Sequence, residues 1–339
     1  MTMKTTIAFW MLLALLPSNL FGQPRHMFLY SGKELTDDVS AATSVEYWGT
    51  AEELVGTEGS EYDLRNMPKL EVLALFKHEV TQAELEYIAQ VDQLKCLEFG
   101  HPGDSVRVTG DASVLSQLKS LEEITICFHD ITDETLSFLK SLHGLKYIDI
   151  TFGDVNSNDG VYHLTNEFGT TLAAIKSLEG IFIHPHGDFD DRFCQELATL
   201  PKLEWFQVGS MKFTDESLRH LSTSPTLKGI SSESLLFTDA GVAHLRKLKQ
   251  LERLSLDSPK ITRDAFPYIA EMRGLKDLML PVKEMKAEDF RFLAGLESLE
   301  EFGVWKAKFG DEAFAPLAGH QHIRELILGS STLTMKSLS

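Results

Sequence analysis

Histidine and aspartate residues gather near the middle of the chain at a spacing that could bind a metal ion. His184 and His186 form an H-x-H pair, and Asp188 and Asp190 follow at the same spacing. Two imidazoles and a carboxylate are ligands that suit Zn²⁺. The motif is short, however, and the spacing fixes no third ligand. We therefore expect no metal at His184 and His186, and the sequence indicates no other cofactor.

Two acidic residues suggest a second kind of chemistry. Glu98 and Asp149 are a candidate carboxylate pair, and an inverting glycosidase uses two such groups about 6.5–9.5 Å apart as acid and base. Acidic residues number 50 in this chain of 339 residues, so chance placement also accounts for the pair. The sequence has no nucleophile elbow, zinc-protease motif, phosphate-binding loop or dinucleotide-binding loop. It therefore predicts a protein that is not an enzyme.

The elements that must position these residues are clearest between residues 203 and 250. This segment begins with Leu203-Glu-Trp-Phe-Gln-Val and continues with Phe213-Thr-Asp-Glu-Ser-Leu, and the same layout returns 24 residues later. The apolar positions first have the period of a strand and then that of a helix. Thr214 and Thr238 stand where a helix N-cap is expected, with acidic residues in the first turn. One unit is therefore a strand, a turn, a helix and a return.

Copies of this unit run along most of the chain. Their first apolar strand residues are Leu70, Leu94, Leu121, Leu145, Leu178, Leu203, Leu227, Leu251, Leu275, Leu299 and Ile323. A unit this small cannot bury its own apolar face, so it is stable only when it stacks on its neighbours. In this spacing, and in the Phe-Thr-Asp or Ile-Thr-Asp step before several helices, the chain resembles the leucine-rich-repeat family in a divergent bacterial form. The resemblance covers about residues 67 to 339.

The resemblance implies an α/β fold, a right-handed horseshoe with parallel strands on the concave face and helices on the convex face. Places one, four and six of each repeat then point into the core, and places three and five point into the concavity. Place three reads Val72, Cys96, Glu123, Tyr147, Gly180, Trp205, Gly229, Arg253, Asp277, Glu301 and Glu325. Place five reads Ala74, Glu98, Thr125, Asp149, Phe182, Gln207, Ser231, Ser255, Met279, Gly303 and Ile327.

Large aromatic residues gather on this concave side in neighbouring repeats, with acidic residues beside them. The members are Tyr147, Phe152, Phe182, Trp205, Glu98, Glu123 and Asp149. Aromatic anchors with a polar rim are typical of interaction hot spots, so we expect these residues to bind a partner. Alternatively, a loop inserted at residues 151–160 folds over the rings and buries them.

Glu98 and Asp149 fall two repeats apart at one strand place, hence ~9–10 Å apart, near the upper end of the glycosidase range.

The N-terminal residues have the composition of a secretory signal peptide. In residues 1–22 Lys4 is the only charged residue, and an apolar core is followed by a cleavage site after Gly22. A retained N-terminal anchor is the alternative. No later segment is long and apolar enough to span a bilayer. We therefore expect the mature protein to be periplasmic or secreted.

The remaining chain divides into two predicted parts. Residues 23–66 are expected to form an N-terminal cap with a degenerate repeat, and residues 67–339 a solenoid of about eleven repeats. The last repeat is incomplete. Its core face is therefore either exposed or covered by another molecule, and we favour a homodimer formed through this end.

Charge and cysteine content narrow the possible partners. The formal net charge is −18, which repels phosphate backbones, argues against nucleic acid and favours a cationic partner. Cys96, Cys127 and Cys194 are odd in number and lie in different repeats, so we expect free, buried thiols.

The sequence predicts an exported, non-enzymatic binding or scaffold protein that recognises a protein or peptide through the concave face. One alternative is a carbohydrate-binding or weakly glycoside-hydrolysing protein that uses the same acidic and aromatic surface. A second is a substrate adaptor, because some intracellular adaptors carry a similar repeat. The predicted signal peptide disfavours that role.

Overall fold

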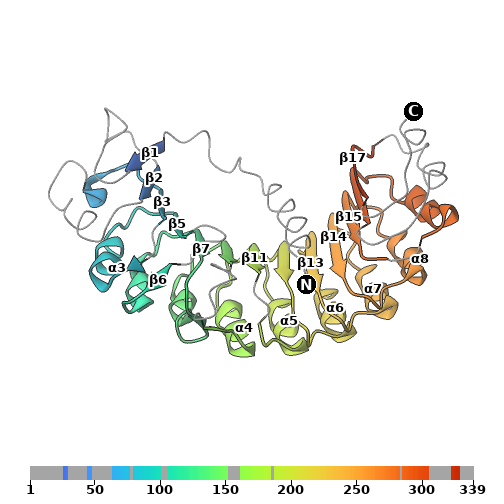
Figure 1. Ribbon diagram of the computed structural model, residues 1–339, viewed down its shortest axis with the longest axis horizontal. Helices are drawn as coiled ribbons and strands as arrows, with labels where there is room; N and C mark the ends of the chain where they lie inside the picture. The colour runs from blue at the N-terminus through green and yellow to red at the C-terminus, as the bar shows by residue number, and fades with distance from the viewer. Residues whose placement is uncertain are drawn as a thin grey trace.

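The computed structural model describes residues 26–29, 44–47, 63–76, 79–100, 106–151, 161–184, 187–282, 285–304 and 322–328. Within these ranges, one parallel sheet of 13 strands follows the order of the chain. Its strands are β1 (His26–Leu29), β2 (Ser44–Tyr47), β3 (Val72–Leu75), β5 (Cys96–Phe99), β7 (Glu123–Ile126), β9 (Tyr147–Ile150), β11 (Gly180–Ile183), β12 (Trp205–Val208), β13 (Gly229–Glu233), β14 (Arg253–Asp257), β15 (Asp277–Leu280), β16 (Glu301–Val304) and β17 (Glu325–Leu328). The sheet lines the inner side of an arc (Figure 1).

Short helices cover the outer side of the arc (Figure 1). The α-helices are α3 (Gln82–Ile88), α4 (Asn166–Ala173), α5 (Asp191–Leu197), α6 (Asp215–Leu221), α7 (Asp239–Leu245) and α8 (Phe266–Ile269). The 3₁₀ helices are η2 (Leu64–Asn66), η3 (Ala112–Gln117), η4 (Ser137–Ser141), η5 (Arg263–Ala265) and η6 (Ala287–Gly295). Two short strand pairs lie outside the main sheet: β4 (Glu79–Val80) with β6 (Arg107–Val108), and β8 (Ile131–Thr132) with β10 (Tyr162–His163). The chain is therefore an α/β leucine-rich-repeat solenoid, as predicted.

The apolar places of each repeat form the core between the sheet and the helices. In the sixth repeat, Leu203, Phe206 and Val208 have at most 1% of their surface exposed. Burial of each such side chain stabilises the fold by roughly 1.5–3 kcal/mol, and it requires the neighbouring repeat to cover it. The three cysteines are free and buried, as predicted.

The Phe-Thr-Asp step and its variants join several neighbouring repeats. Phe213 is fully buried, and the side chain of Thr214 caps α6 by accepting a hydrogen bond from the N–H of Glu216. The Asp215 carboxylate reaches the next repeat, where it accepts bonds from the Thr238 N–H at 2.8 Å and the Thr238 hydroxyl at 2.6 Å. We call these Asp–Thr pairs the clamps; they are Asp133–Thr165, Asp191–Thr214, Asp215–Thr238 and Asp239–Thr262.

Buried serines connect the same repeats just after the strands. Ser210, Ser234 and Ser258 occupy place eight and are at most 1% exposed. Each hydroxyl donates to a backbone carbonyl of the preceding repeat, as Ser234 does to Phe213 at 2.6 Å. The hydroxyl of each also accepts a backbone N–H two residues later, as Ser234 does from Leu236. These serines satisfy the polar backbone where the chain turns away from the sheet.

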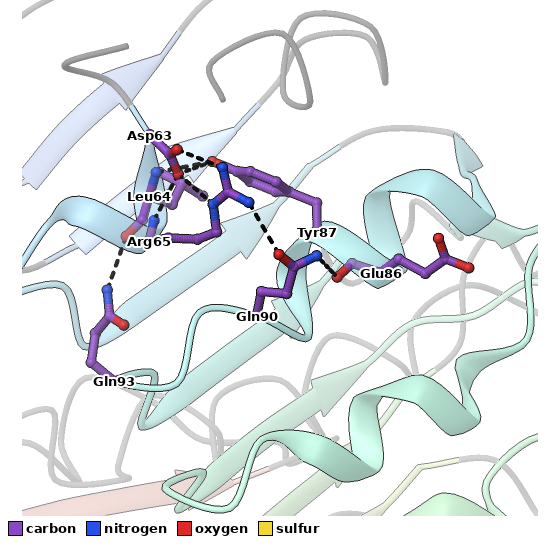
Figure 2. A network of polar contacts seen from close by, with 7 residues as sticks. All are labelled: Asp63, Leu64, Arg65, Glu86, Tyr87, Gln90 and Gln93. Carbon is purple, nitrogen blue, oxygen red and sulfur yellow. Dashed lines mark hydrogen bonds and ion pairs between the residues drawn. The ribbon is translucent and has the colours of Figure 1, made fainter. Parts of the chain in front are cut away.

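At the N-terminal end, the sheet continues into the range predicted to be a cap. β2 pairs in parallel with β3, and β1 pairs with β2. Figure 2 shows how η2 is tied to α3 in the first full repeat. The Tyr87 hydroxyl donates to Asp63 at 3.1 Å and accepts the N–H of Leu64 at 2.9 Å, while Arg65 bonds to Asp63 and lies 5.2 Å above the Tyr87 ring. The boundary at residue 66 stays a prediction.

Several predictions concern residues outside the described ranges. They are the signal peptide at residues 1–22, residues 152–160 of the inserted loop, and the end of the last repeat with its expected homodimer contact. In the part of the chain that is described, no helix has the length and apolar character needed to cross a bilayer.

Candidate functional site

The sheet register places equivalent residues of successive repeats side by side. Tyr147 pairs with Gly180, Gly180 with Trp205, Trp205 with Gly229, and Gly229 with Arg253. The same register extends from Val72 to Glu325. The predicted alignment of strand places is therefore confirmed. Because side chains alternate along each strand, places three and five form two rows across the concave face.

The rings of Tyr147 and Trp205 each extend over the glycine of the next strand. Both are half-buried. A Cβ atom on Gly180 would meet the Tyr147 ring at 2.6 Å, and one on Gly229 would meet the Trp205 ring at 2.3 Å. The missing side chains of Gly180 and Gly229 thus give both rings room to cross to a neighbouring strand.

Phe182 is not the exposed anchor that the sequence predicts. Only 7% of its surface is exposed. Its ring bends back over Gly180, where a Cβ atom would meet it at 2.8 Å, and shares that space with the ring of Tyr147. Phe182 therefore lies within the concave surface and does not project from it. Phe152, the fourth predicted aromatic residue, lies outside the described residues.

Arg253 is a member of the site that the sequence does not indicate. Its guanidinium group lies 5.3 Å from the centre of the Trp205 ring, two strands away. The Nε atom of Arg253 is 2.6 Å from Oδ2 of Asp277 on the next strand. Gly229 has no side chain between them, so Arg253 stacks on Trp205. Both the stack and the ion pair fix the position of the Trp205 ring.

A shallow pocket lies beside Trp205 on the concave face. Its lining residues are Phe182, Trp205, Phe206, Gln207, Gly229, Ile230, Ser231, Arg253, Leu254, Ser255, Asp277, Met279 and Glu301. The pocket holds about 50 Å³ of space, and most of its surface is apolar. Small-molecule sites usually hold roughly 300–1,000 Å³. The pocket therefore has room for about one amino-acid side chain.

Carboxylates flank the pocket on both sides. On the N-terminal side are the predicted residues Glu98, Glu123 and Asp149. The pKa of Glu123 is raised, mainly by burial and next by the negative charge of Glu98. On the C-terminal side, burial raises the pKa of Asp277, although the charge of Arg253 acts in the opposite direction. The pKa of Glu301 is raised mainly by burial and next by the negative charge of Asp277. From β2 to β17, Arg253 is the only base at places three and five. These two rows are therefore strongly acidic.

His184 takes part in a polar row on the concave face. Its Nε2 atom is 3.5 Å from Oδ1 of Asp149, and its Nδ1 atom is 3.5 Å from the amide nitrogen of Gln207. Of the other predicted ligands, Asp188 pairs with Lys212 and Asp190 caps α5. His186 lies outside the described residues. Among the residues that are described, no group of three His, Cys, Asp or Glu side chains is arranged to hold a metal ion.

Glu98 and Asp149 lie two strands apart at place five, with Thr125 between them. This is the separation that the sequence predicts. Asp149 is close to His184, whereas Glu98 accepts a weak bond from the Cys96 thiol at 3.7 Å. Neither environment assigns one carboxyl group as the acid and the other as the base.

Place two carries a row of alternating charges along one border of the concave face. We call it the charge ladder; it runs Glu71, Lys95, Glu122, Lys146, Glu179, Glu204, Lys228, Glu252, Lys276, Glu300 and Arg324. Each base pairs with the acid of the preceding repeat, as Lys146 does with Glu122 at 2.7 Å and Lys228 with Glu204 at 2.8 Å. The other pairs are Lys95–Glu71, Lys276–Glu252 and Arg324–Glu300.

No family model and no curated protein matches this chain. Among solved structures, an internalin from Listeria monocytogenes is 16% identical, with 81% of this chain and 79% of that chain covered and a TM-score of 0.48. A leucine-rich-repeat protein from Leptospira interrogans is 15% identical, with 87% and 80% covered and a TM-score of 0.45.

A third solved structure, of a TLR13–ssRNA13 complex, is 16% identical. The match covers 86% of this chain but only 44% of the other chain, with a TM-score of 0.49. The fold of this protein is defined by the register of its own strands, which is independent of these matches.

Proposed function

We propose that this protein is an exported, non-enzymatic binding protein whose concave face holds a basic protein or peptide. The pocket beside Trp205 carries the proposal, because it is an apolar hollow bordered by acidic rows. An apolar side chain of the partner would enter the pocket, and cationic groups around it would meet the carboxylates. Aromatic anchors with a charged surround are typical of interaction hot spots.

The size and charge of the surface support a macromolecular, cationic partner. A pocket of about 50 Å³ is too small to enclose a drug-sized ligand. The net charge of −18 disfavours phosphate-rich partners. For the carbohydrate alternative, the environments of Glu98 and Asp149 supply no acid–base assignment, and no contact in the described part of the chain favours a substrate adaptor.

Trp205→Ala is expected to weaken partner binding by about 30-fold or more, because it removes the aromatic anchor and the surface on which Arg253 stacks. The measurement is quantitative affinity capture from the medium and the cell envelope of the source organism. Tyr268→Ala is the matched control, since Arg246 stacks on Tyr268 at 5.6 Å in α8, on the convex face. Equal loss of the captured protein in both variants would reject the concave pocket as the binding centre.

Export is tested separately. We propose that residues 1–22 direct the chain out of the cytoplasm and are removed after Gly22. Mass spectrometry of the protein recovered from its native source should give an N-terminus at Gln23. Recovery of the intact chain in the cytoplasm would contradict export.

A further inference from the structure

The charge ladder has one irregularity, and it lies beside the aromatic residues. Along the described part of the ladder, every acid except Glu179 is followed by a base in the next repeat, and that base bonds to it. After Glu179 the next repeat carries Glu204 instead of a lysine or arginine. Glu204 is paired with Lys228, and Lys146 is paired with Glu122. Glu179 is therefore the acid for which the ladder provides no base of its own.

The backbone brings this position next to the pocket. The carbonyl oxygen of Glu179 accepts hydrogen bonds from the N–H groups of Glu204 at 2.8 Å and Trp205 at 2.9 Å. Among the described residues, the Glu179 carboxylate accepts one hydrogen bond, from the Tyr147 hydroxyl at 3.1 Å. Burial is the largest cause that raises the pKa of Tyr147, and the hydrogen bond to Glu179 is the second. The hydroxyl therefore stays neutral and acts as a donor. A carboxylate has room for further donors, and a neutral phenol does not balance its charge.

We propose that a lysine or arginine of the bound partner completes the charge ladder at Glu179, while an apolar side chain of the same segment enters the pocket beside Trp205. This inference rests on the proposed function and names the chemistry of the partner. Charge complementarity indicates a cationic side chain as the occupant, because Glu179 is the one acid of the ladder that has no base in the next repeat. The apolar lining of the adjacent pocket sets the second requirement.

The sheet fixes the spacing of the two side chains. Glu179 directly precedes β11, and the pocket-lining residue Gly229 lies in β13, two strands further on and one place along the strand. Two steps of about 4.8 Å give roughly 10 Å across the sheet. A polyproline II segment rises about 3.1 Å per residue and repeats its facing every three residues. A cation at one position and an apolar residue three positions later therefore fit this surface.

The test is a set of fluorescein-labelled, proline-rich heptapeptides titrated against the purified mature chain. Position one is lysine or glutamine, and position four is leucine or alanine. The protein variants are Glu179→Gln, which keeps an acceptor for Tyr147, and Glu71→Gln as the matched control at a paired position far along the ladder. Binding is expected to fall about tenfold for Glu179→Gln with the lysine peptide and to stay unchanged with the glutamine peptide. Glu71→Gln should leave binding by both peptides unchanged.

The outcomes separate this inference from the proposed function. If Trp205→Ala abolishes binding but Glu179→Gln and the peptide lysine show no coupling, the ladder assignment is wrong and concave binding stands. Equal effects of Glu179→Gln and Glu71→Gln would also overturn the assignment, because they would indicate only a general charge effect. If no peptide binds and Trp205→Ala leaves protein capture unchanged, both proposals fail.

Discussion

Replacing Asp191 with alanine should lower the free energy of unfolding by roughly 3 kcal/mol. The Asp191 carboxylate accepts four hydrogen bonds from the next repeat. Two come from the N–H and hydroxyl of Thr214 at 2.9 and 2.7 Å, and two from the N–H and hydroxyl of Ser217 at 3.1 and 2.5 Å. Ser217 is fully buried, so the alanine variant would leave its hydroxyl without this partner in the interior of the protein.

The same clamp makes stability depend on pH. Burial alone would raise the pKa of Asp191, but hydrogen bonds from Ser217 and Thr214 outweigh it and hold the pKa below its ordinary value of 3.8. A carboxyl group with a lowered folded pKa contributes stability that is fully present above the unfolded value. That contribution is lost as the pH falls through the folded value. The stability advantage of the wild type over Asp191→Asn should therefore shrink below about pH 4.

Chemical denaturation followed by circular dichroism across this pH range checks both expectations. Asp264→Ala is the control, because Asp264 is an exposed acid in the first turn of the helical segment of a later repeat, without a clamp partner among the described residues. A difference between wild type and Asp191→Asn that stays constant from pH 7 to pH 3 would show that the charge of Asp191 does not contribute through the clamp.

The strand register was predictable from the sequence because many equivalent residues determine it together. A shift by one residue in any repeat would move its apolar places out of the core, as Leu227 and Ile230 illustrate. The N-caps were also predictable, since Thr214 and Thr238 precede their own helices directly. Each of these features depends on residues within one repeat or on a strict period.

Features that join two repeats were not predictable in the same way. The sequence shows Asp215 as a first-turn acid, but only the stacked helices show that its carboxylate bonds to Thr238. Gly229 and Arg253 both occupy place three, but the sequence does not show that Gly229 leaves room for Arg253 to reach Trp205. The sequence places the centre of the site at Tyr147, Phe182 and Trp205, whereas the pocket extends from Phe182 toward the C-terminal repeats and does not include Tyr147.

The charge ladder was present in the sequence but easily missed. Its signal is the alternation of negative and positive residues at place two, directly before the place-three row. Glu179 and Glu204 are each unremarkable acids in a chain with 50 acidic residues. Only the ion pairs of the neighbouring repeats show that a base is missing between them.

Gly229→Val should weaken binding of the lysine–leucine heptapeptide by about 30-fold, as much as loss of the Trp205 ring, while changing the free energy of unfolding by less than about 1 kcal/mol. A Cβ atom at this position would lie 2.3 Å from the Trp205 ring, so the ring must leave its place over β13 and its stack with Arg253. The ring can move into the open concavity, and valine favours a strand, so the fold itself is little affected. Peptide titration measures the binding loss, and a red shift of tryptophan fluorescence reports the moved ring.

A double-mutant cycle shows whether the valine acts through the tryptophan. In a Trp205→Ala background the added side chain has no ring to displace, so Gly229→Val should cause little further loss of binding. A loss of similar size in both backgrounds would mean that the valine obstructs the pocket directly. Because Trp205 and Gly229 face each other across β12 and β13, the cycle measures whether the glycine is needed to hold the ring in its binding position.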